Sequence, residues 1–364
     1  MDLQKKRDYS FDAVRGFCMF LIPLQHFLAA DKPFVYGSVG GYLYLVIDLF
    51  VMQVFFFLSG YFSKNAARGR QIAAGSLLWP VIVMWLACGL VRVAGFAIPI
   101  RLYRPPYAMW FLLCLFYYRM FQTAYLKIPH LAGVVFVLGL LIGLVPFIGR
   151  DFALARAINW MPYFLLGYYC QPAHISRLRS LKGWQTAGLL AVLLGGIWLF
   201  LRYAAFDAYK AVQMADSYAG MHVTVWQGIA LHIVVFFTGI AFLVVLLNLF
   251  KGRQDRPGLW SWIGQHTMPV YIFHLPVKYL LYRFGIGFGV LQFSAGSLPA
   301  CMYVAALAFV VTVVLATPPF NWLYDLLFVR SLAALKWCAG HMLVPAGAVV
   351  QKVFDRGLKL LRLT

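Results

Sequence analysis

Glutamate is absent from this chain of 364 residues, and charged residues of all kinds make up only 12% of it. All 11 acidic residues are aspartates, which excludes chemistry that depends on Glu, such as the paired Glu of many glycosidases. Hydrophobic residues reach 63% and the mean hydropathy is +0.79, so the chain is neither a soluble globule nor disordered. The net charge of +20 is spread between apolar runs and forms no basic domain, so we expect no nucleic-acid partner.

Motifs for metals, disulfides and nucleotides are also missing. The six cysteines stand singly, mostly inside apolar runs, and form neither a disulfide framework nor a metal-ligand pattern. No CxxC, HExxH or GxxxxGK[ST] motif occurs, and no GxGxxG motif follows a strand pattern. The sequence therefore predicts no metal, no tightly bound cofactor and no soluble nucleotide-binding domain.

Long apolar stretches recur along the whole chain and are separated by short polar joints. A bilayer core of about 30 Å requires roughly 20 apolar residues in a helix. Ten stretches fit this length and predict an all-α, polytopic membrane protein. The predicted spans are residues 11–30, 41–62, 72–97, 108–126, 131–148, 157–171, 184–205, 223–250, 260–282 and 298–328.

Lysine and arginine are distributed unevenly among the joints, and short cytoplasmic loops retain these residues. Every second polar segment is richer in lysine and arginine than its neighbours. Both ends of the chain belong to this richer set, so both termini are predicted to be cytoplasmic. We divide the chain into a membrane domain, residues 1–330, and a basic amphipathic cytoplasmic tail, residues 331–364. The tail is expected to lie on anionic lipid, and an eleventh span within it is the alternative.

The first predicted span carries ionisable residues, which are costly in a membrane and are therefore candidates for function. Arg15 and His26 are eleven residues apart, so on a straight helix they share one face with a rise of about 16 Å between them. Asp12 precedes Arg15 by one turn as a candidate partner, and Pro23 predicts a kink before His26. The alternative is structural, with Arg15 reaching the lipid headgroups and His26 capping the far end.

A second pair of histidines lies in the ninth predicted span. His266 and His274 are eight residues apart, which places them on one helix face, and Tyr271 adds a hydroxyl between them. Pro269 and Pro276 predict that this span is broken around a polar cavity. The alternative is that both rings satisfy interhelical hydrogen bonds and have no catalytic role.

The residue types in the first span suit the transfer of a group from a phosphorylated donor. A neutral imidazole takes and returns a proton near pH 7, because its ordinary pKa is about 6.5. Arginine suits phosphate, since its guanidinium stays charged and offers several donors. A helix with Arg15 near the cytoplasm and His26 deeper in the membrane is therefore able to hold such a donor while acting on an acceptor further in.

Five sequence blocks follow one another along the predicted spans. The first is YSFDAVRGFCMFLIPLQHF, with Arg15 and His26. The others are FFFLSGYF with Ser59 and Gly60, AMWFLLCLFYYR with Trp110 and Phe111, NWMPYFLLGYYC with Gly167, and IGQHTMPVYIFHLPV with Gly264, Tyr271 and His274. Together these blocks cover the first nine spans, and they resemble the integral-membrane acyltransferase family 3.

Two of the blocks continue in a way that resembles one subgroup of that family, the polysaccharide O-acetylases that are often described as fucose-O-acetylase-like. These continuations are YFSK, which begins two residues after Ser59, and YYR at the end of the Trp110 block. The chain reads Val51, Met52 and Gln53 where that subgroup commonly has His-Met-Pro.

The resemblance implies an enzyme that moves an acyl group, usually acetyl, from cytoplasmic acyl-CoA to a sugar hydroxyl. Acetyl-CoA is then a co-substrate, and the acceptor is an exopolysaccharide or its lipid-linked repeat unit, at the bacterial inner membrane. His26 is implied as the catalytic base or the transient acyl carrier, and Arg15 as the residue that orients the donor. The donor or acceptor channel is expected to include Asp12, Ser59, Trp110, Tyr271, His274 and His266.

Two other functions stay open on the residues alone. Intramembrane His26, His266 and His274 also suit a relay in a polytopic transporter of a glycan or a proton-coupled solute. A structural subunit of a polysaccharide synthase complex is the third reading, and it predicts that substitutions of these histidines are silent.

Overall fold

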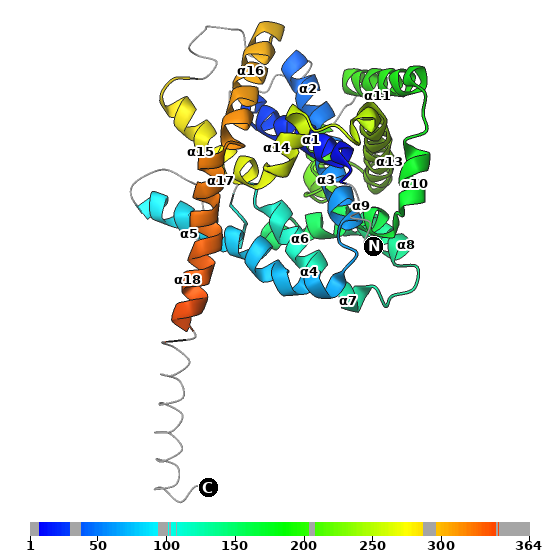
Figure 1. Cartoon of the computed structure of the whole chain (residues 1–364). Coiled ribbons are helices and arrows are strands. Elements are labelled where there is room, and N and C mark those ends of the chain that lie inside the picture. Colours follow the sequence, from blue (N-terminus) through cyan, green and yellow to red (C-terminus); the bar gives the residue numbers. More distant parts are fainter. Residues whose placement is uncertain are drawn as a thin grey trace, which may run out of the picture.

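The computed structural model describes residues 7–29, 38–93, 101, 103–106, 108–203, 208–286, 296–339 and 341. All regular secondary structure within these residues is helical, which confirms the all-α prediction (Figure 1). The helices of the first half are α1 Tyr9–Leu28, α2 Val39–Asp48, α3 Val51–Tyr61, α4 Ala66–Ala73, α5 Trp79–Val93, α6 Trp110–Met120, α7 Gln122–Tyr125, α8 Leu131–Ile142 and α9 Leu154–Tyr169. Those of the second half are α10 Pro172–Leu178, α11 Gly183–Tyr203, α12 Ala208–Val212, α13 Val225–Leu249, α14 Leu259–Gln265, α15 Thr267–Arg283, α16 Leu298–Leu315, α17 Pro318–Tyr324 and α18 Ser331–Cys338.

Five helical stretches of the described residues are long and apolar enough to cross a membrane. They are Val39–Tyr61, Ala66–Val93, Gly183–Tyr203, Val225–Leu249 and Leu298–Leu315. α6 and α8 are shorter apolar helices, and the remaining predicted spans fall on α1, α9 and the pair α14 and α15. The chain is thus helical and membrane-spanning, whereas the total of ten spans and the side on which the termini lie stay predictions.

The tenth predicted span, residues 298–328, is wrong at its C-terminal end. α16 ends at Leu315, and a new helix, α17, begins at Pro318. Proline has no backbone N–H and is favoured in the first turn of a helix, so Pro318 and Pro319 start a helix here and do not continue one. α17 and α18 lie at the edge of the bundle and project away from it (Figure 1). Most of the predicted tail lies outside the described residues.

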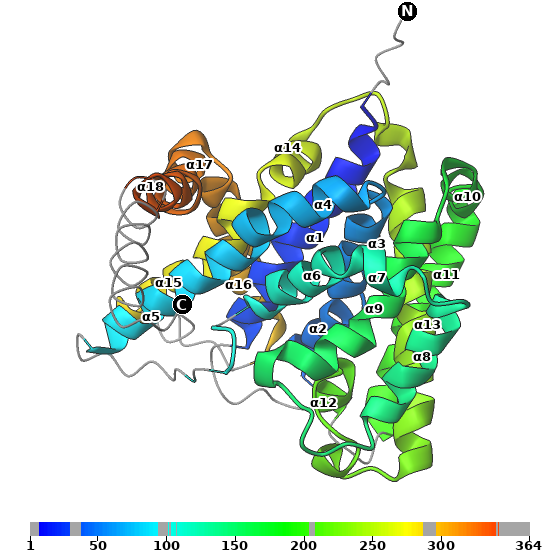
Figure 2. The same cartoon turned by 90° about the horizontal axis from the view of Figure 1, so that it is seen from below.

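α1 lies in the middle of the bundle and is surrounded by other helices (Figure 2). It packs mainly against α14, α15 and α16, and also against α2 and α3. Val14, Cys18 and Phe27 of α1 are completely buried. The helix that carries the predicted catalytic residues is therefore a core element, and its ionisable side chains lie inside protein and not in lipid.

Two close helix crossings fix the positions of the central helices. α1 crosses α14 where Gly16 meets Gly264, and α3 crosses α9 where Gly60 meets Gly167. A Cβ atom added to any of these four glycines would overlap backbone atoms of the opposite helix. Small residues allow membrane helices to approach closely. All four glycines belong to the sequence blocks described above, and their role is to set helix spacing.

The crossing of α3 and α9 is held by a lysine at its end. The Lys64 ammonium group donates hydrogen bonds to the carbonyl oxygens of Gly167, at 3.1 Å, of Cys170, at 2.9 Å, and of Tyr168. These carbonyls end α9, and a cation is favourable at the C-terminus of a helix. Lys64, which follows α3 directly, therefore joins the ends of both helices.

Candidate active site

One face of α1 lines a cavity of about 180 Å³. Arg15, Met19 and Ile22 follow one another on this face at helical spacing, and His26 continues it one turn beyond Ile22. α1 stays a single helix through Pro23. The structure thus places Arg15 and His26 as the spacing predicted, at two depths of one face.

The opposite walls of the cavity come from other helices that carry predicted site residues. Ser59 of α3 and Tyr271 of α15 both line it, together with apolar side chains of α3 and α6. Arg119, in the last turn of α6, lines it as well. The structure therefore brings Arg15, Ser59 and Tyr271 to one cavity and adds a second arginine to them.

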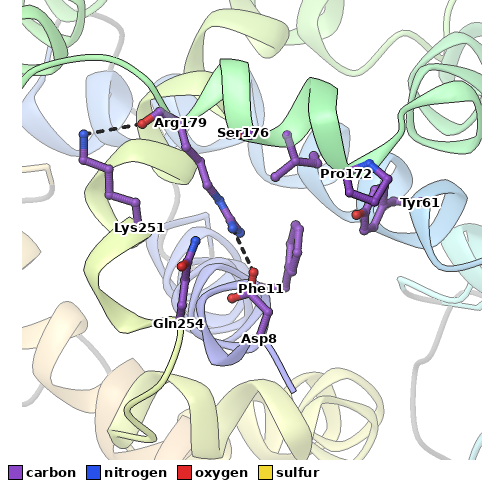
Figure 3. Close-up of a pocket in the computed structure, with 9 residues that line it drawn as sticks. Asp8, Phe11, Tyr61, Pro172, Ser176, Arg179, Lys251 and Gln254 are labelled. Atoms are coloured by element: carbon purple, nitrogen blue, oxygen red, sulfur yellow. Dashed lines mark hydrogen bonds and ion pairs between the residues drawn. The ribbon is translucent and has the colours of Figure 1, made fainter. Parts of the chain in front are cut away.

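A larger pocket of about 460 Å³ lies near the start of α1, but its cations are engaged in holding helices together (Figure 3). Arg179 forms an ion pair with Asp8 at 2.8 Å and lies over the Phe11 ring. Lys251 donates to the carbonyl oxygens of Arg179 and Leu181. This pocket therefore offers little free positive charge to a ligand.

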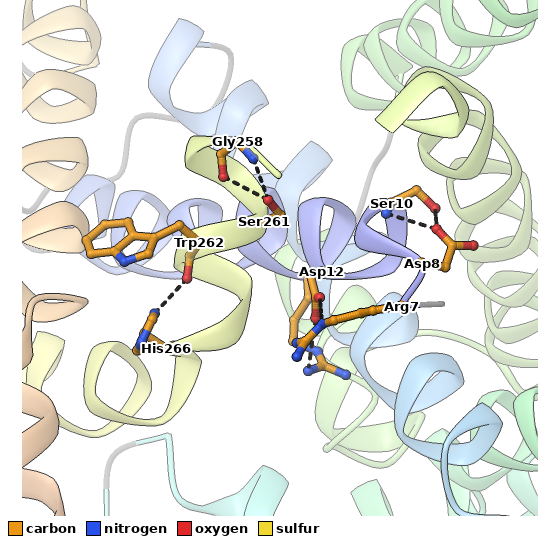
Figure 4. Close-up of polar contacts among 9 residues, drawn as sticks. Arg7, Asp8, Ser10, Asp12, Gly258, Ser261, Trp262 and His266 are labelled. Atoms are coloured by element: carbon orange, nitrogen blue, oxygen red, sulfur yellow. Dashed lines mark hydrogen bonds and ion pairs between the residues drawn. The ribbon is translucent and has the colours of Figure 1, made fainter. Parts of the chain in front are cut away.

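Asp12 pairs with the predicted Arg15 and with a second arginine, Arg7. Its carboxylate accepts a hydrogen bond from Nε of Arg7 at 2.7 Å (Figure 4). The nearest Arg15 nitrogen is 4.0 Å away, within ion-pair distance but too long for a hydrogen bond. The Arg15 guanidinium lies over the Phe62 ring, 5.7 Å from its centroid. Arg15 is thus ion-paired with Asp12 without a hydrogen bond to it, and its N–H donors are left for a ligand.

Arg119 is the residue at this end of the cavity that sequence reasoning missed. Its Nε atom is fully buried and has no hydrogen-bond partner. The end of α6 lies next to the end of α3, because Gln122 donates to the Ser63 carbonyl oxygen at 2.9 Å. Arg119 therefore lies at the same end of the cavity as Arg15. The only signal in the sequence was its place in the YYR that ends the Trp110 block.

His26 and His274 meet at the other end. Their ring centroids are 5.2 Å apart, and the ring planes differ by 33°. His274 is completely buried, and its Nδ1 lies 3.0 Å from the Val270 carbonyl oxygen. Because a carbonyl only accepts hydrogen bonds, Nδ1 carries the proton of the neutral ring, and Nε2, which has no partner, is left as an acceptor.

Tyr271 connects this histidine pair to the cavity. Its hydroxyl donates to the Ala108 carbonyl oxygen, just before α6, and its ring lies 5.9 Å from that of Phe111. Tyr271 is buried and lies one turn before His274 on α15. It therefore fixes the start of α6 against α15 and forms part of the wall between the cavity and the histidines.

Asp48 and Arg156, which the sequence did not single out, lie around His26. Asp48 ends α2 and accepts a hydrogen bond from Gln25, the neighbour of His26 on α1. Arg156, in the first turn of α9, places its guanidinium carbon 4.4 Å from the centroid of the Trp110 ring. His26, Asp48, Trp110 and Arg156 all keep part of their surface accessible. The predicted Trp110 therefore belongs to the His26 end of the site.

His266 is not brought to the other predicted residues. It lies at the break between α14 and α15, where its Nδ1 bonds to the Trp262 carbonyl oxygen at 2.8 Å (Figure 4). The span is broken, but at His266 and not at the prolines, because α15 runs through Pro269 and Pro276. The break ends the shared face, since eight residues keep one face only on a continuous helix. His266 therefore has a backbone partner one turn earlier in the chain, and not the interhelical partner of the alternative reading.

The chain was also compared with known proteins. No curated protein and no solved structure matches the chain. Residues 8–317 match the acyltransferase domain of family 3, a stretch that includes α1 to α16 and every residue of the cavity and the histidine pair. Because the match covers most of the chain, the protein belongs to acyltransferase family 3 and is a membrane acyltransferase.

Proposed function

We propose that the protein transfers an acyl group, acetyl in the first instance, from cytoplasmic acyl-CoA to a sugar hydroxyl. The acceptor is an exopolysaccharide or its lipid-linked repeat unit, and the enzyme resides in the bacterial inner membrane. The observation that carries this proposal is the continuous face of α1, on which Arg15, the cavity and His26 follow one another. The Arg15 end then faces the cytoplasm, in agreement with the distribution of cations among the loops.

The donor half of the proposal rests on the two arginines and the apolar cavity. Arg15 and Arg119 suit the phosphates of CoA, because a guanidinium binds phosphate with several charge-assisted hydrogen bonds. The rise from Arg15 to His26 is about 16 Å. The long arm of CoA separates its phosphates from the thioester, so it would run through the cavity past Ser59 and Tyr271 toward His26.

The chemical step needs a base beside the thioester, and His26 is placed for this role. As the hydroxyl oxygen of the acceptor attacks the thioester carbonyl, His26 removes its proton, the C–S bond breaks, and the CoA sulfur takes up the proton. His274 positions the His26 ring from 5.2 Å away. If His26 instead carries the acyl group, rapid quenching will trap acylated protein before the acceptor is added.

The substitution His26→Ala tests the proposal. With radiolabelled acetyl-CoA and membranes containing the acceptor, we expect transfer to sugar to fall by about 10³-fold, since a positioned acid–base group contributes about 10²–10⁴-fold. His266→Ala is the matched control and should retain transfer. Mass spectrometry of the surface polysaccharide, with and without the protein, would identify acetyl or succinyl. Normal acylation by His26→Ala would contradict the mechanism, and solute flux without acyl transfer would support a transporter instead.

A further inference from the structure

Three arginines lie around the start of α9, and two of them are neutralised. Nε of Arg104 is 2.5 Å from a carboxylate oxygen of Asp151. The Arg150 guanidinium donates two hydrogen bonds to Asp216, at 2.7 and 3.2 Å. No aspartate among the described residues lies within ion-pair distance of Arg156. Of the three arginines, Arg156 is therefore the one whose charge is not compensated by an ion pair with a described aspartate.

Arg156 also has unused hydrogen-bonding capacity. Its Nε atom is fully buried and has no partner. Asp48 acts on Arg156 electrostatically without touching it, and the Asp48 carboxylate already accepts from Gln25. A buried N–H donor of a charged group that lacks a hydrogen-bond partner lowers stability. Such a group persists where a ligand completes it, so the surroundings of Arg156 favour an anion.

Trp110 determines how Arg156 presents its donors. The guanidinium carbon lies over the indole ring, 4.4 Å from the centroid, which is the geometry of a cation–π contact. This contact covers a face of the planar guanidinium and leaves the N–H groups at its edge. A carboxylate or phosphate binds arginine at that edge, through two parallel hydrogen bonds. Trp110 thus holds Arg156 in an orientation suited to bidentate binding.

Arg156 lies near the proposed catalytic base, so an anion bound to it would be near the reacting groups. Arg156 lies close enough to His26 to act on it electrostatically, and both residues keep accessible surface. His274, by contrast, is completely buried. His26, Arg156 and Trp110 thus each have accessible surface that a ligand held between them would contact.

We propose that Arg156, held by Trp110, binds an anionic group of the acceptor, a carboxylate or a phosphate on its sugar, and thereby places a neighbouring hydroxyl at His26. This inference rests on the proposed function and names its substrate class, an acidic glycan. Arg156 is a binding residue in this scheme and Trp110 is a positioning residue.

The test compares matched acceptors made from one polysaccharide. Surface polysaccharide of the producing cells is freed of its acyl groups with alkali and fragmented. It is then used unmodified, after reduction of its carboxyl groups, or after phosphatase treatment. With purified full-length protein and radiolabelled acetyl-CoA, we expect kcat/KM to fall at least tenfold when the relevant anion is removed. The treatment that lowers transfer identifies the anion as carboxylate or phosphate.

Variants assign this preference to Arg156. In Arg156→Gln the ratio between unmodified and neutralised acceptor should fall to near one, and Arg156→Lys should give an intermediate ratio, because lysine keeps the charge but loses the planar fork. Arg104→Gln removes a neutralised arginine and should keep the full ratio. Size-exclusion chromatography and retained acetyl-CoA binding show that each variant is folded.

The outcomes separate the two proposals. Equal transfer to all acceptor forms, or a ratio that Arg156→Gln leaves unchanged, would overturn the acidic-acceptor inference and leave the acyltransferase proposal standing. Absence of transfer to every form, by a wild-type protein that is folded, would contradict the proposed function itself.

Discussion

The two ends of α1 use the same type of residue in different surroundings. At the Arg15 end, Arg15 and Arg119 border a mainly apolar cavity. At the His26 end, Arg156 lies on an indole ring, beside two imidazoles and a carboxylate. An arginine at the mouth of an apolar passage suits a ligand that continues into the passage. An arginine fixed on an aromatic ring beside the proposed base suits a ligand whose reacting group must be held next to that base.

The two ends nevertheless share one electrostatic arrangement. Near Arg15, the exposed Arg7 takes the hydrogen bond of Asp12. Near Arg156, Arg150 takes the carboxylate of Asp216. In both places an outer arginine forms the short hydrogen bond with an acid. The inner arginine keeps its donors, because Arg15 is 4.0 Å from Asp12 and Arg156 forms no ion pair with a described aspartate. With no Glu in the chain and only 11 acids, this distribution decides which cations stay free for ligands.

The largest effect on activity is expected at His274, whose ring lies beside that of His26. His274→Ala removes the buried ring beside His26, so we expect kcat to fall by about 10²-fold, with little change in KM for acetyl-CoA. Steady-state kinetics with both substrates would measure this. His266→Ala, on the same stretch of chain but bonded to Trp262, should change kcat by less than about threefold. A His274→Ala enzyme with normal kcat would show that the second histidine only fills space.

A smaller effect should separate the donor end from the acceptor end. Arg15→Lys keeps the charge but loses the guanidinium fork, and Arg119→Gln loses both. We expect KM for acetyl-CoA to rise about 10- to 100-fold, since a hydrogen bond to a charged group contributes about 1.5–3 kcal/mol. KM for the sugar acceptor should stay unchanged. If either substitution alters acceptor selectivity and leaves donor KM intact, the assignment of the two ends is reversed.

The smallest effect is expected from a substitution that leaves the residues at the Arg15 end and at the His26 end unchanged. Lys64→Met removes the ammonium group that binds three carbonyl oxygens at the end of α9. We expect the free energy of unfolding to fall by about 1–3 kcal/mol, with kcat and both KM values retained at low temperature. Thermal unfolding in detergent would measure the loss. Lys182→Met, which changes an exposed lysine at the start of α11, serves as the control and should not lower Tm.

The sequence was sufficient for the features that depend on regular spacing. The all-α class followed from apolar runs, and the shared face of Arg15 and His26 followed from an eleven-residue interval on a helix that continues through Pro23. Ser59 entered through the resemblance, whereas Tyr271 and His274 were singled out by the pattern of the ninth span and again by the resemblance. Ser59 and Tyr271 line the cavity, and His274 meets His26.

Features that depend on helix ends were not predictable in the same way. Arg156 lies just before the predicted span 157–171 and so outside it, whereas α9 begins at Leu154 and turns this side chain inward onto Trp110. His266 was placed on the face of His274, but the break at His266 ends that face. Asp48 lies in the second predicted span, and only the approach of α2 to α1 gives it Gln25 as a partner.

The glycines at the two helix crossings show which family features belong to the architecture and not to the chemistry. Gly16 with Gly264, and Gly60 with Gly167, are needed for the distance between backbones and take no part in proton transfer or ligand binding. A relative that kept these glycines but lost His26 would keep the bundle and still resemble its active relatives over most of its length. In such a lineage the glycines mark inherited architecture, whereas His26 distinguishes an enzyme from a scaffold that has been put to another use.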